Sequence, residues 1–315
     1  MTYKIVSNAD LVPKVLDTLT PYCDVKRWYN DEPNDPAVLQ EAEGFFVYGH
    51  PHITGEVMNS MPNCRVISNF GVGVDHIDLE AAKARGIPVG NTPGFVDGAT
   101  ADMTFTLLMA AARNVVIGHQ YAIGPDFLHY NPDLHHGQEI YGSTLGIIGM
   151  GRIGKEVARR ASGFDMKVLY HNRNRDLEAE AALNVSYATL PELLKEADFV
   201  TLNMPLTPET RGMIGAAELA QMKSSAILIN LARGGVVQHD ALVDALRNKT
   251  IWAAALDVTE PEPLPRDNPL LTLENVIIAP HLGSATLRTR KAMVQRTTDN
   301  LLAGLRGEAL LSRVA

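Results

Sequence analysis

The sequence predicts an α/β protein with two domains, each built around a doubly wound parallel β-sheet. Short apolar runs alternate with longer helical patterns from the N-terminus onward, which is typical of parallel strands linked by helices. A second series of the same kind begins near residue 143. The chain of 315 residues is too long for most single hydrophobic cores, so two domains are expected.

The composition narrows the classes of partner. Hydrophobic residues make up 46% of the chain and charged residues 20%, which is ordinary for a globular protein. The net charge of -8, without a Lys/Arg block, argues against nucleic acid or an anionic membrane as the main partner. No apolar run reaches about 18 residues and no secretion signal is recognisable, so we expect a cytoplasmic protein. In that reducing compartment, Cys23 and Cys64 are expected to be buried thiols.

The first third of the chain predicts four strands. Their apolar runs are KIVSNA from Lys4, GFFVYG from Gly44, RVISNFG from Arg65 and IPVGNT from Ile87. The following stretch, 97–116, is rich in Ala, Leu and Met, and Asp97 is suited to cap a helix there. We therefore expect one long helix that bridges two lobes.

The C-terminal segment predicts an amphipathic helix. In 283–308, apolar Met293, Leu301 and Leu305 recur at helical spacing. If this helix returns to the first lobe, that lobe is discontinuous. The expected domains are then 1–98 with 285–315, and 99–284.

A glycine-rich motif opens the second series. GIIGMGRIG carries Gly-x-Gly-x-x-Gly on Gly149, Gly151 and Gly154, after an apolar run and before a helical pattern. Dinucleotide sites require this strand, turn and helix: the first Gly makes the turn, the second lets backbone approach the pyrophosphate, and the third allows close packing. The helix N-terminus supplies free N–H groups for phosphates. The pattern predicts a dinucleotide site.

The next strand ends with unusual residues for such a site. MKVLYH ends about 20 residues beyond the loop, where an acid usually binds the adenosine ribose of NAD. Asn172, Arg173 and Arg175 occupy this region instead. Arginines pair with phosphate in fork geometry, and Asn172 does not repel it. We expect NADP(H) to be preferred, with NAD(H) still possible; the alternative is a solvated cluster of surface arginines.

Three later apolar runs each end on a polar residue. SAILINLARGG ends on Arg233, WAAALDVTEPEPLP reaches Asp257 and Glu262, and NVIIAPHLGSA reaches His281. Continuous apolar runs suit strands covered on both faces, whose carboxyl ends open into the ligand crevice. Each residue alone has a structural explanation. Together, a cation, an acid and an imidazole at one sheet edge favour a catalytic site.

These motifs resemble the D-isomer-specific 2-hydroxyacid dehydrogenase family over nearly the whole chain. The stretches that carry the resemblance are GVGVDHIDLEAAKARGIPVGNTPG, LGIIGMGRIG, MPLTPETRGMI, INLARGGVV, ALDVTEPEP and APHLGSAT. The C-terminal part is most similar to glyoxylate/hydroxypyruvate reductases. The resemblance implies a Rossmann domain inserted into a flavodoxin-like substrate domain. It also implies reduction of a small 2-oxo acid, such as glyoxylate, hydroxypyruvate or a 2-ketoaldonate, to the D-2-hydroxy acid. With the arginines after MKVLYH, we expect this reduction to use NADPH.

The family roles transfer to named residues. Arg233 would bind the substrate carboxylate and keto oxygen, and His281 would donate a proton to the carbonyl oxygen. Glu262 would favour the protonated form of His281. Backbone N–H groups of Val72 and Gly73 would bind the carboxylate from the other lobe.

The resemblance also implies further cofactor contacts beyond the glycine loop. They are Thr104, Arg152, Ile153, Pro205, Thr210, Leu231, Asp257 and Gly283. Asp257 would lie near the nicotinamide amide. Pro205 and Leu231 have an alternative role in strand-end packing.

Some features stay open at this point. FLHYNPDLHHG has His129 and Tyr130 where relatives often carry Trp, so the preferred 2-oxo acid is undecided. His50 and His52 are candidates for substrate contact or for plain solvent exposure. No metal is expected, because neither His50-x-His52 nor His135-His136 has zinc-site spacing.

An oligomeric state and an alternative function also follow from the resemblance. The resemblance implies a homodimer, with the long bridging helix and FLHYNPDLHHG as contact regions. An alternative function is a dinucleotide-sensing, corepressor-like interaction protein on the same fold, which the NADP-type cations weigh against.

Overall fold

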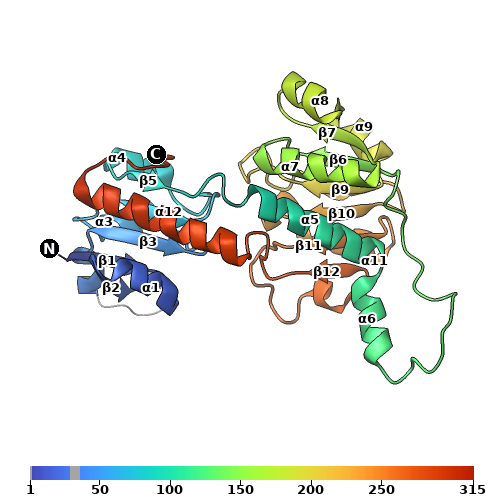
Figure 1. The fold of residues 1–315 in the computed structure, drawn as a ribbon, viewed down its shortest axis with the longest axis horizontal. Helices are drawn as coiled ribbons and strands as arrows, with labels where there is room; N and C mark the ends of the chain where they lie inside the picture. The colour runs from blue at the N-terminus through green and yellow to red at the C-terminus, as the bar shows by residue number, and fades with distance from the viewer. Residues whose placement is uncertain (1, 29–35) are drawn as a thin grey trace. The chain divides into compact units, whose positions relative to one another are not determined.

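The computed structural model describes residues 2–28 and 36–315, in two compact units (Figure 1). The first unit combines the described residues of Met1–Val96 with Thr286–Ala315, and the second is Asp97–Ala285. Each unit has its own parallel sheet. The α/β prediction is confirmed.

The first unit contains a five-stranded sheet in the order β2-β1-β3-β4-β5. Its strands are β1 Tyr3–Ser7, β2 Cys23–Arg27, β3 Gly44–Tyr48, β4 Ile67–Phe70 and β5 Val89–Gly90. All pairs are parallel, which is the expected flavodoxin-like order. Strand β2 was not predicted from the sequence, because this edge strand buries only Cys23 fully and has no apolar run.

The C-terminal helix belongs to this first unit. The helices here are α1 Pro13–Leu19, α2 Pro36–Gln40, α3 Gly55–Asn59, α4 Leu79–Ala84 and α12 Leu287–Arg306. The Thr286 side chain caps α12 by accepting the N–H of Thr289, and Gly307 ends it with a φ of 76°. The Ser68 hydroxyl in β4 donates to the Thr297 carbonyl at 2.7 Å, and α12 lies across β3 and β4 (Figure 1).

The second unit contains a seven-stranded parallel sheet in the order β12-β11-β10-β9-β6-β7-β8. Its strands are β6 Thr144–Ile148, β7 Lys167–His171, β8 Ser186–Tyr187, β9 Phe199–Leu202, β10 Ile227–Asn230, β11 Ala253–Leu256 and β12 Val276–Ile278. Every residue of β9, β10 and β11 is buried, as their continuous apolar runs predict. The strand order reverses between β6 and β9, which is where such sheets bind ligands.

Helices cover both faces of this sheet. They are α5 Asp97–Ala112, α6 Val115–Ile123, α7 Arg152–Ala161, α8 Leu177–Leu183, α9 Leu190–Glu196, α10 Ala216–Leu219 and α11 His239–Arg247. Short 3₁₀ turns lie at Ser162–Phe164, Gly234–Val236 and Pro269–Thr272. One apolar core includes residues of α5, α7 and α8, and the other includes residues of α9, α10 and α11.

The single helix expected over 97–116 is wrong beyond Ala112. Asn114 adopts a left-handed φ of 51°, which Asn tolerates better than most residues. Its side-chain amide donates to the carbonyls of His135 and His136, at 3.3 and 3.0 Å. The chain therefore breaks there and starts α6.

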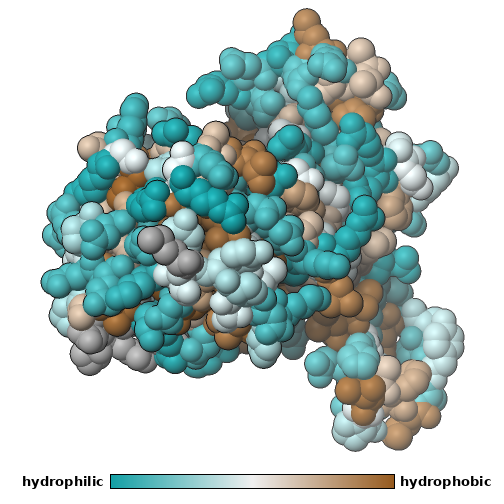
Figure 2. Space-filling view, turned by 60° about the vertical axis from the view of Figure 1, so that its left-hand side comes forward, coloured by the Kyte–Doolittle hydropathy of each residue, from teal (hydrophilic) through white to brown (hydrophobic). Residues whose placement is uncertain are grey.

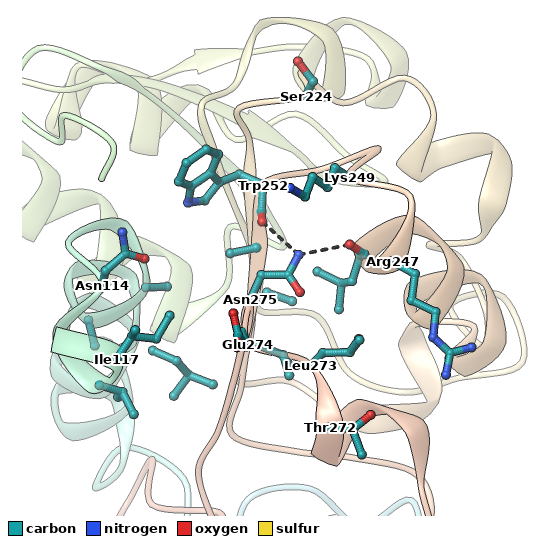
Figure 3. A pocket seen from close by; sticks show the side chains of 18 residues that line it. Asn114, Ile117, Ser224, Arg247, Lys249, Trp252, Thr272, Leu273, Glu274 and Asn275 are labelled. Atoms are coloured by element: carbon teal, nitrogen blue, oxygen red, sulfur yellow. Dashed lines mark hydrogen bonds between the residues drawn. The ribbon is translucent and has the colours of Figure 1, made fainter. Parts of the chain in front are cut away.

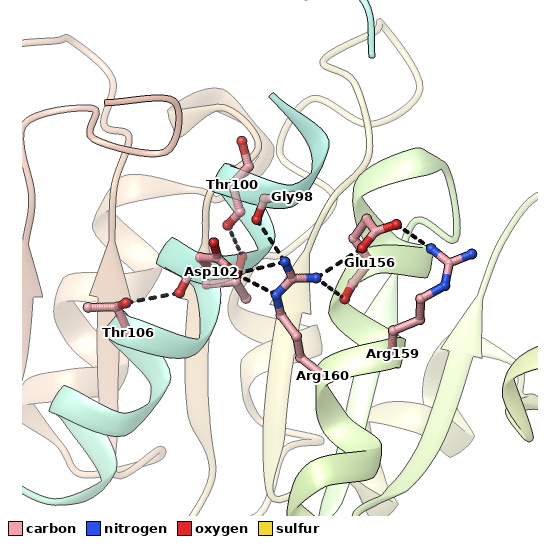
Figure 4. Close-up of polar contacts among 8 residues, drawn as sticks. Gly98, Thr100, Asp102, Thr106, Glu156, Arg159 and Arg160 are labelled. Carbon is pink, nitrogen blue, oxygen red and sulfur yellow. Dashed lines mark hydrogen bonds and ion pairs between the residues drawn. The ribbon is translucent and has the colours of Figure 1, made fainter. Parts of the chain in front are cut away.

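Arg160 fixes α7 against α5. Its Nε donates to Asp102 Oδ1 at 2.7 Å, its Nη2 donates to the Gly98 carbonyl at 3.1 Å, and its Nη1 contacts Glu156 in its own helix (Figure 4). The network is partly exposed, so each pair adds modestly to stability. Its structural effect is to hold the helix that starts at the glycine loop.

Two further sequence expectations concern the whole chain. Cys23 and Cys64 are buried free thiols, and burial raises the pKa of each to about 11. Within 2–28 and 36–315, no helix combines the length and apolarity needed to cross a membrane.

Candidate active site

The glycine loop has the geometry that a pyrophosphate needs. β6 ends at Ile148, Gly149 has a φ of 101°, and α7 begins at Arg152. A Cβ on Gly149 would lie 2.7 Å from the backbone between Asn203 and Met204, and one on Gly154 would overlap the Gly149 carbonyl oxygen. A Cβ on Gly151 would meet nothing within 4 Å. The first and third glycines are thus required by packing, and the second leaves open space for a ligand.

A cavity of about 630 Å³ lies beside this loop. It is lined by Ile148, Gly149, His171, Asn172, Arg173, Asn174, Met204, Pro205, Thr207, Glu209, Thr210 and Met213. Five residues predicted to bind the cofactor are among them. These are Gly149, Asn172, Arg173, Pro205 and Thr210. The size and the position at the carboxyl ends of the strands fit the adenosine half of a dinucleotide.

The three polar residues after β7 have different surroundings. The Asn172 side-chain oxygen accepts the N–H of Met150 at 2.8 Å, so Asn172 holds the glycine loop as well as lining the cavity. Arg173 is exposed and lines the cavity. Arg175 instead forms two hydrogen bonds of 2.7 Å with Glu180 of α8. The predicted arginine pair is therefore divided between the cavity and the start of a helix.

The three charged strand ends lie on neighbouring strands. β10, β11 and β12 are adjacent and parallel, so the segments that follow them leave the sheet at one edge. His281 Nδ1 lies 2.7 Å from Glu262 Oε1, with side chains 30% and 37% exposed. With Nδ1–H donated to the carboxylate, Nε2 is the nitrogen that can exchange a proton with a ligand. The arrangement can therefore perform general acid and base chemistry.

Asp257 holds the turn that carries His281. The His281 N–H donates to the Asp257 carbonyl at 3.0 Å, while the Asp257 carboxylate accepts the N–H groups of Leu282 and Gly283 at 2.6 and 2.7 Å. His281 has a left-handed φ of 56°, which costs free energy for a residue with a side chain. Burial raises the pKa of the Asp257 carboxyl, and the two N–H donors oppose that shift. Each Asp257 carboxylate oxygen accepts one hydrogen bond from this turn, and its predicted contact with the nicotinamide amide stays a prediction.

The turn carrying Glu262 packs against the loop that carries Arg233. A Cβ on Gly234 would overlap backbone atoms of Thr259 and Glu260, so only glycine fits there, whereas one on Gly235 would meet the end of the Glu260 side chain. The Thr259 N–H reaches Glu262 Oε2 at 3.3 Å. Because these loops pack directly, the sheet edge presents Arg233 and Glu262 on a continuous surface.

Asn230 positions the backbone of Arg233 and was not among the residues predicted from the sequence. This side chain is 1% exposed at the end of β10. Its amide donates to the Arg233 carbonyl and accepts the Ala232 N–H, each at 2.9 Å. The sequence signal for it was a polar residue ending an apolar run, because a buried amide needs hydrogen-bond partners.

Other predicted cofactor contacts differ in exposure. Thr104 is fully buried in α5 and its hydroxyl donates to the Thr100 carbonyl at 2.9 Å, and its contact with the cofactor stays a prediction. Ile153 and Leu231 are half-buried and pack against the apolar core. Arg152 is exposed at the start of α7, 3.9 Å from Asp97. Gly283 is buried beside Asp257.

The remaining predicted residues lie elsewhere. Val72 and Gly73 belong to the first unit, where Asn91 donates its side-chain N–H to the Val72 carbonyl at 2.9 Å. The ring of His50 contacts that of His76 at 5.1 Å between centroids. His129 and Tyr130 are exposed in the segment after α6.

A second cavity, of about 500 Å³, lies at the opposite edge of the large sheet (Figure 3). It is lined by residues of α5 and α6, the end of α11 and the beginnings of β11 and β12. Asn275 lines this cavity, and its side-chain amide donates to the carbonyls of Leu246 and Trp252, each at 3.1 Å. This cavity is distant from the carboxyl edge, since it lies at the amino ends of the strands.

Comparisons with known proteins agree with this geometry. The family model described as "D-isomer specific 2-hydroxyacid dehydrogenase, NAD binding domain" matches residues 105–283. A glyoxylate reductase of Korarchaeum cryptofilum is 42% identical over 313 residues, covering 98% of this chain and 94% of that protein. One of Pyrococcus furiosus is 46% identical over 260 residues, covering 81% and 77%.

Solved structures show the same similarity. The NADPH-dependent glyoxylate/hydroxypyruvate reductase of Sinorhizobium meliloti, in complex with NADP and malonate, has a TM-score of 0.90 and 31% identity, covering 100% of this chain and 97% of that chain. These matches confirm the resemblance seen in the sequence and a nicotinamide dinucleotide as cofactor. The chain belongs to the D-isomer specific 2-hydroxyacid dehydrogenases, which makes it an NAD(P)-dependent oxidoreductase acting on 2-oxo acids.

Proposed function

We propose that the protein uses NADPH to reduce a small 2-oxo acid, such as glyoxylate, hydroxypyruvate or a 2-ketoaldonate, to the D-2-hydroxy acid. The observation that carries the proposal is the 2.7 Å contact between His281 and Glu262 at the carboxyl edge of the large sheet. Arg233 follows the neighbouring strand β10. The names of the curated relatives, glyoxylate reductases, support the substrate class.

The second unit is proposed to bind the dinucleotide and the first unit to form the substrate domain. When bound, the nicotinamide supplies the hydride. His281 holds the proton for the carbonyl oxygen on Nε2, and Glu262 stabilises the imidazolium through Nδ1–H. Arg233 binds the carboxylate and keto oxygen with its planar fork of N–H groups. The contact of Val72 and Gly73 with the carboxylate stays a prediction.

The preference for NADPH rests on the residues after β7. The strand end has no carboxylate to repel a 2′-phosphate, and Arg173 lines the adjacent cavity. The similar Sinorhizobium meliloti reductase is NADPH-dependent, which supports the same assignment. NAD(H) is proposed as a weaker alternative.

We also propose a homodimer that forms through α6 and the segment after it. No residue of α6 is buried, and the helix projects from the second unit (Figure 1). Figure 2 shows apolar surface on this projecting part. The exposed apolar residues of this part include Val115, Val116, Ile123, Phe127, Leu128 and Tyr130. Such a patch is typical of a protein interface.

Sedimentation velocity tests this dimer. The expected species has about twice the chain mass of 34.3 kDa at micromolar concentration. Leu128→Asp should shift it toward the monomer, because a buried charge is costly. A parent protein that sediments only as a monomer would contradict the dimer.

A steady-state panel of 2-oxo acids with NADPH and NADH tests the reaction. Glyoxylate and hydroxypyruvate should be reduced, and His281→Ala should lower kcat by about 100-fold or more, because the carbonyl oxygen loses its proton donor. NADPH binding by that variant should stay within about 2-fold of the parent. If no 2-oxo acid is turned over, the dinucleotide-sensing alternative is favoured instead.

Glu262→Gln should change the pH dependence of turnover. Reduction requires protonated His281, and loss of the neighbouring carboxylate makes the imidazolium less stable. Because His281 Nδ1 lies 2.7 Å from this carboxylate, the alkaline fall in the rate of reduction should move to lower pH. Glu260→Gln is the matched control, since Glu260 lies in the same turn but pairs with Arg211. Identical pH–rate profiles for the parent and Glu262→Gln would show that Glu262 does not act on His281 in the reaction.

Arg173→Ala should remove the preference for NADPH. The ratio of kcat/KM for NADPH to that for NADH should fall by about 10-fold or more, because the 2′-phosphate loses its cation. Arg175→Ala is the control, since Arg175 is bound to Glu180. A parent enzyme that uses both cofactors equally would reject the NADPH assignment.

A further inference from the structure

The cavity beside the glycine loop contains an acidic side chain that the sequence analysis did not single out. Among the described residues that line it, Glu209 is the one carboxylate and Arg173 the one guanidinium. They come from different segments: Arg173 follows β7, and Glu209 lies in the loop after β9. A cation and an anion thus share the proposed adenosine site.

The loop holds the Glu209 carboxylate in place. Thr207 Oγ1 donates to Glu209 Oε2 at 2.7 Å. The Thr207 N–H donates to Thr210 Oγ1 at 2.8 Å, and that hydroxyl donates to the Pro205 carbonyl at 2.7 Å. Because the loop is internally hydrogen-bonded, the carboxylate has a fixed anchor at the cavity wall.

Glu209 is ionised at neutral pH. The hydrogen bond from Thr207 is the largest cause that lowers the pKa of its carboxyl, and the positive charge of Arg173 lowers it further. The attraction between the two side chains is reciprocal. Part of the positive potential of Arg173 is therefore already compensated before any ligand binds.

The Glu209 carboxylate opposes binding of a 2′-phosphate in two ways. The phosphate must compete with Glu209 for Arg173, and its charge of about -1.5 to -2 is repelled by Glu209. A ribose with a free 2′-hydroxyl experiences neither effect. An ionised acid at this position thus reduces the advantage that Arg173 gives to the phosphorylated cofactor.

We propose that Glu209 is a specificity-determining residue that weakens the discrimination of this site between NADPH and NADH. The proposal rests on the NADPH assignment above and adds an opposing residue to it. Both side chains are exposed, so solvent and salt screen the interaction and the expected effect is a matter of a few-fold.

The test measures binding of two fragments that differ by the phosphate. Titration calorimetry with adenosine 2′,5′-bisphosphate and with 5′-AMP compares the parent with Glu209→Gln, which keeps the size of the side chain and an oxygen acceptor for Thr207. The variant should bind the bisphosphate about 3- to 10-fold more tightly and 5′-AMP within about 2-fold of the parent. The gain should shrink at about 0.5 M salt, where charges are screened.

Glu196→Gln is the matched control. Glu196 ends α9 and pairs with Lys167, the first residue of β7, at the opposite edge of the sheet. This substitution removes the same charge from the same unit and should leave both affinities unchanged. An equal gain in Glu196→Gln would mean that net charge, rather than the position of Glu209, controls binding.

The inference and the proposed function fail in different ways. If Glu209→Gln leaves bisphosphate binding unchanged or weaker while Arg173→Ala weakens it, Glu209 has no such role and the NADPH site stands. If the parent does not distinguish the bisphosphate from 5′-AMP and Arg173→Ala has no effect, the NADPH assignment itself fails.

Discussion

The buried carboxylate of Asp257 is the interaction on which the proposed catalytic geometry depends. The carboxylate accepts the backbone N–H groups of Leu282 and Gly283, and the backbone carbonyl of Asp257 accepts the N–H of His281. These three hydrogen bonds attach the turn from His281 to Gly283 to the end of β11. Burying a carboxylate is unfavourable unless it is hydrogen-bonded. These bonds offset that cost and hold His281 in a left-handed conformation that the residue would otherwise avoid. The imidazole thereby reaches Glu262, which comes from a different loop.

Close backbone packing between the loops after β10 and β11 also supports the proposed catalytic geometry. Glycines 234 and 235 let the Arg233 loop pack against the turn that precedes Glu262, and Asn230 satisfies the backbone groups of the Arg233 loop. A side chain at Gly234 would push the two loops apart. The proposed catalytic residues are therefore positioned by groups that need not take part in any chemistry themselves.

The charges around the adenosine-side cavity are balanced rather than simply positive. Arg175 is paired with Glu180, Arg173 faces a cavity that also contains Glu209, and Asn172 is bonded to the glycine loop. The proposed cofactor preference is then a difference between attraction and repulsion at one exposed site.

The sequence by itself determined the fold class, the glycine loop and the polar strand ends. These features are local: an apolar run, a helix period or a glycine spacing needs no knowledge of distant residues. The family resemblance added roles for Arg233, Glu262 and His281. Strand β2 was not predicted because this edge strand buries only one side chain in five. The helix break at Asn114 was not predicted because it depends on carbonyls 21 and 22 residues away.

Only the tertiary structure decided which polar groups meet. His281 and Glu262 come from separate loops, and so do Arg173 and Glu209, which line one cavity. The burial of Thr104 and the pairing of Arg175 with Glu180 likewise depend on the folded backbone. A sequence pattern states that a charged residue follows a strand, but the direction of its side chain depends on what packs around the loop. For that reason the sequence predicted the edge of the sheet where a site forms, and the packing of loops decided its members.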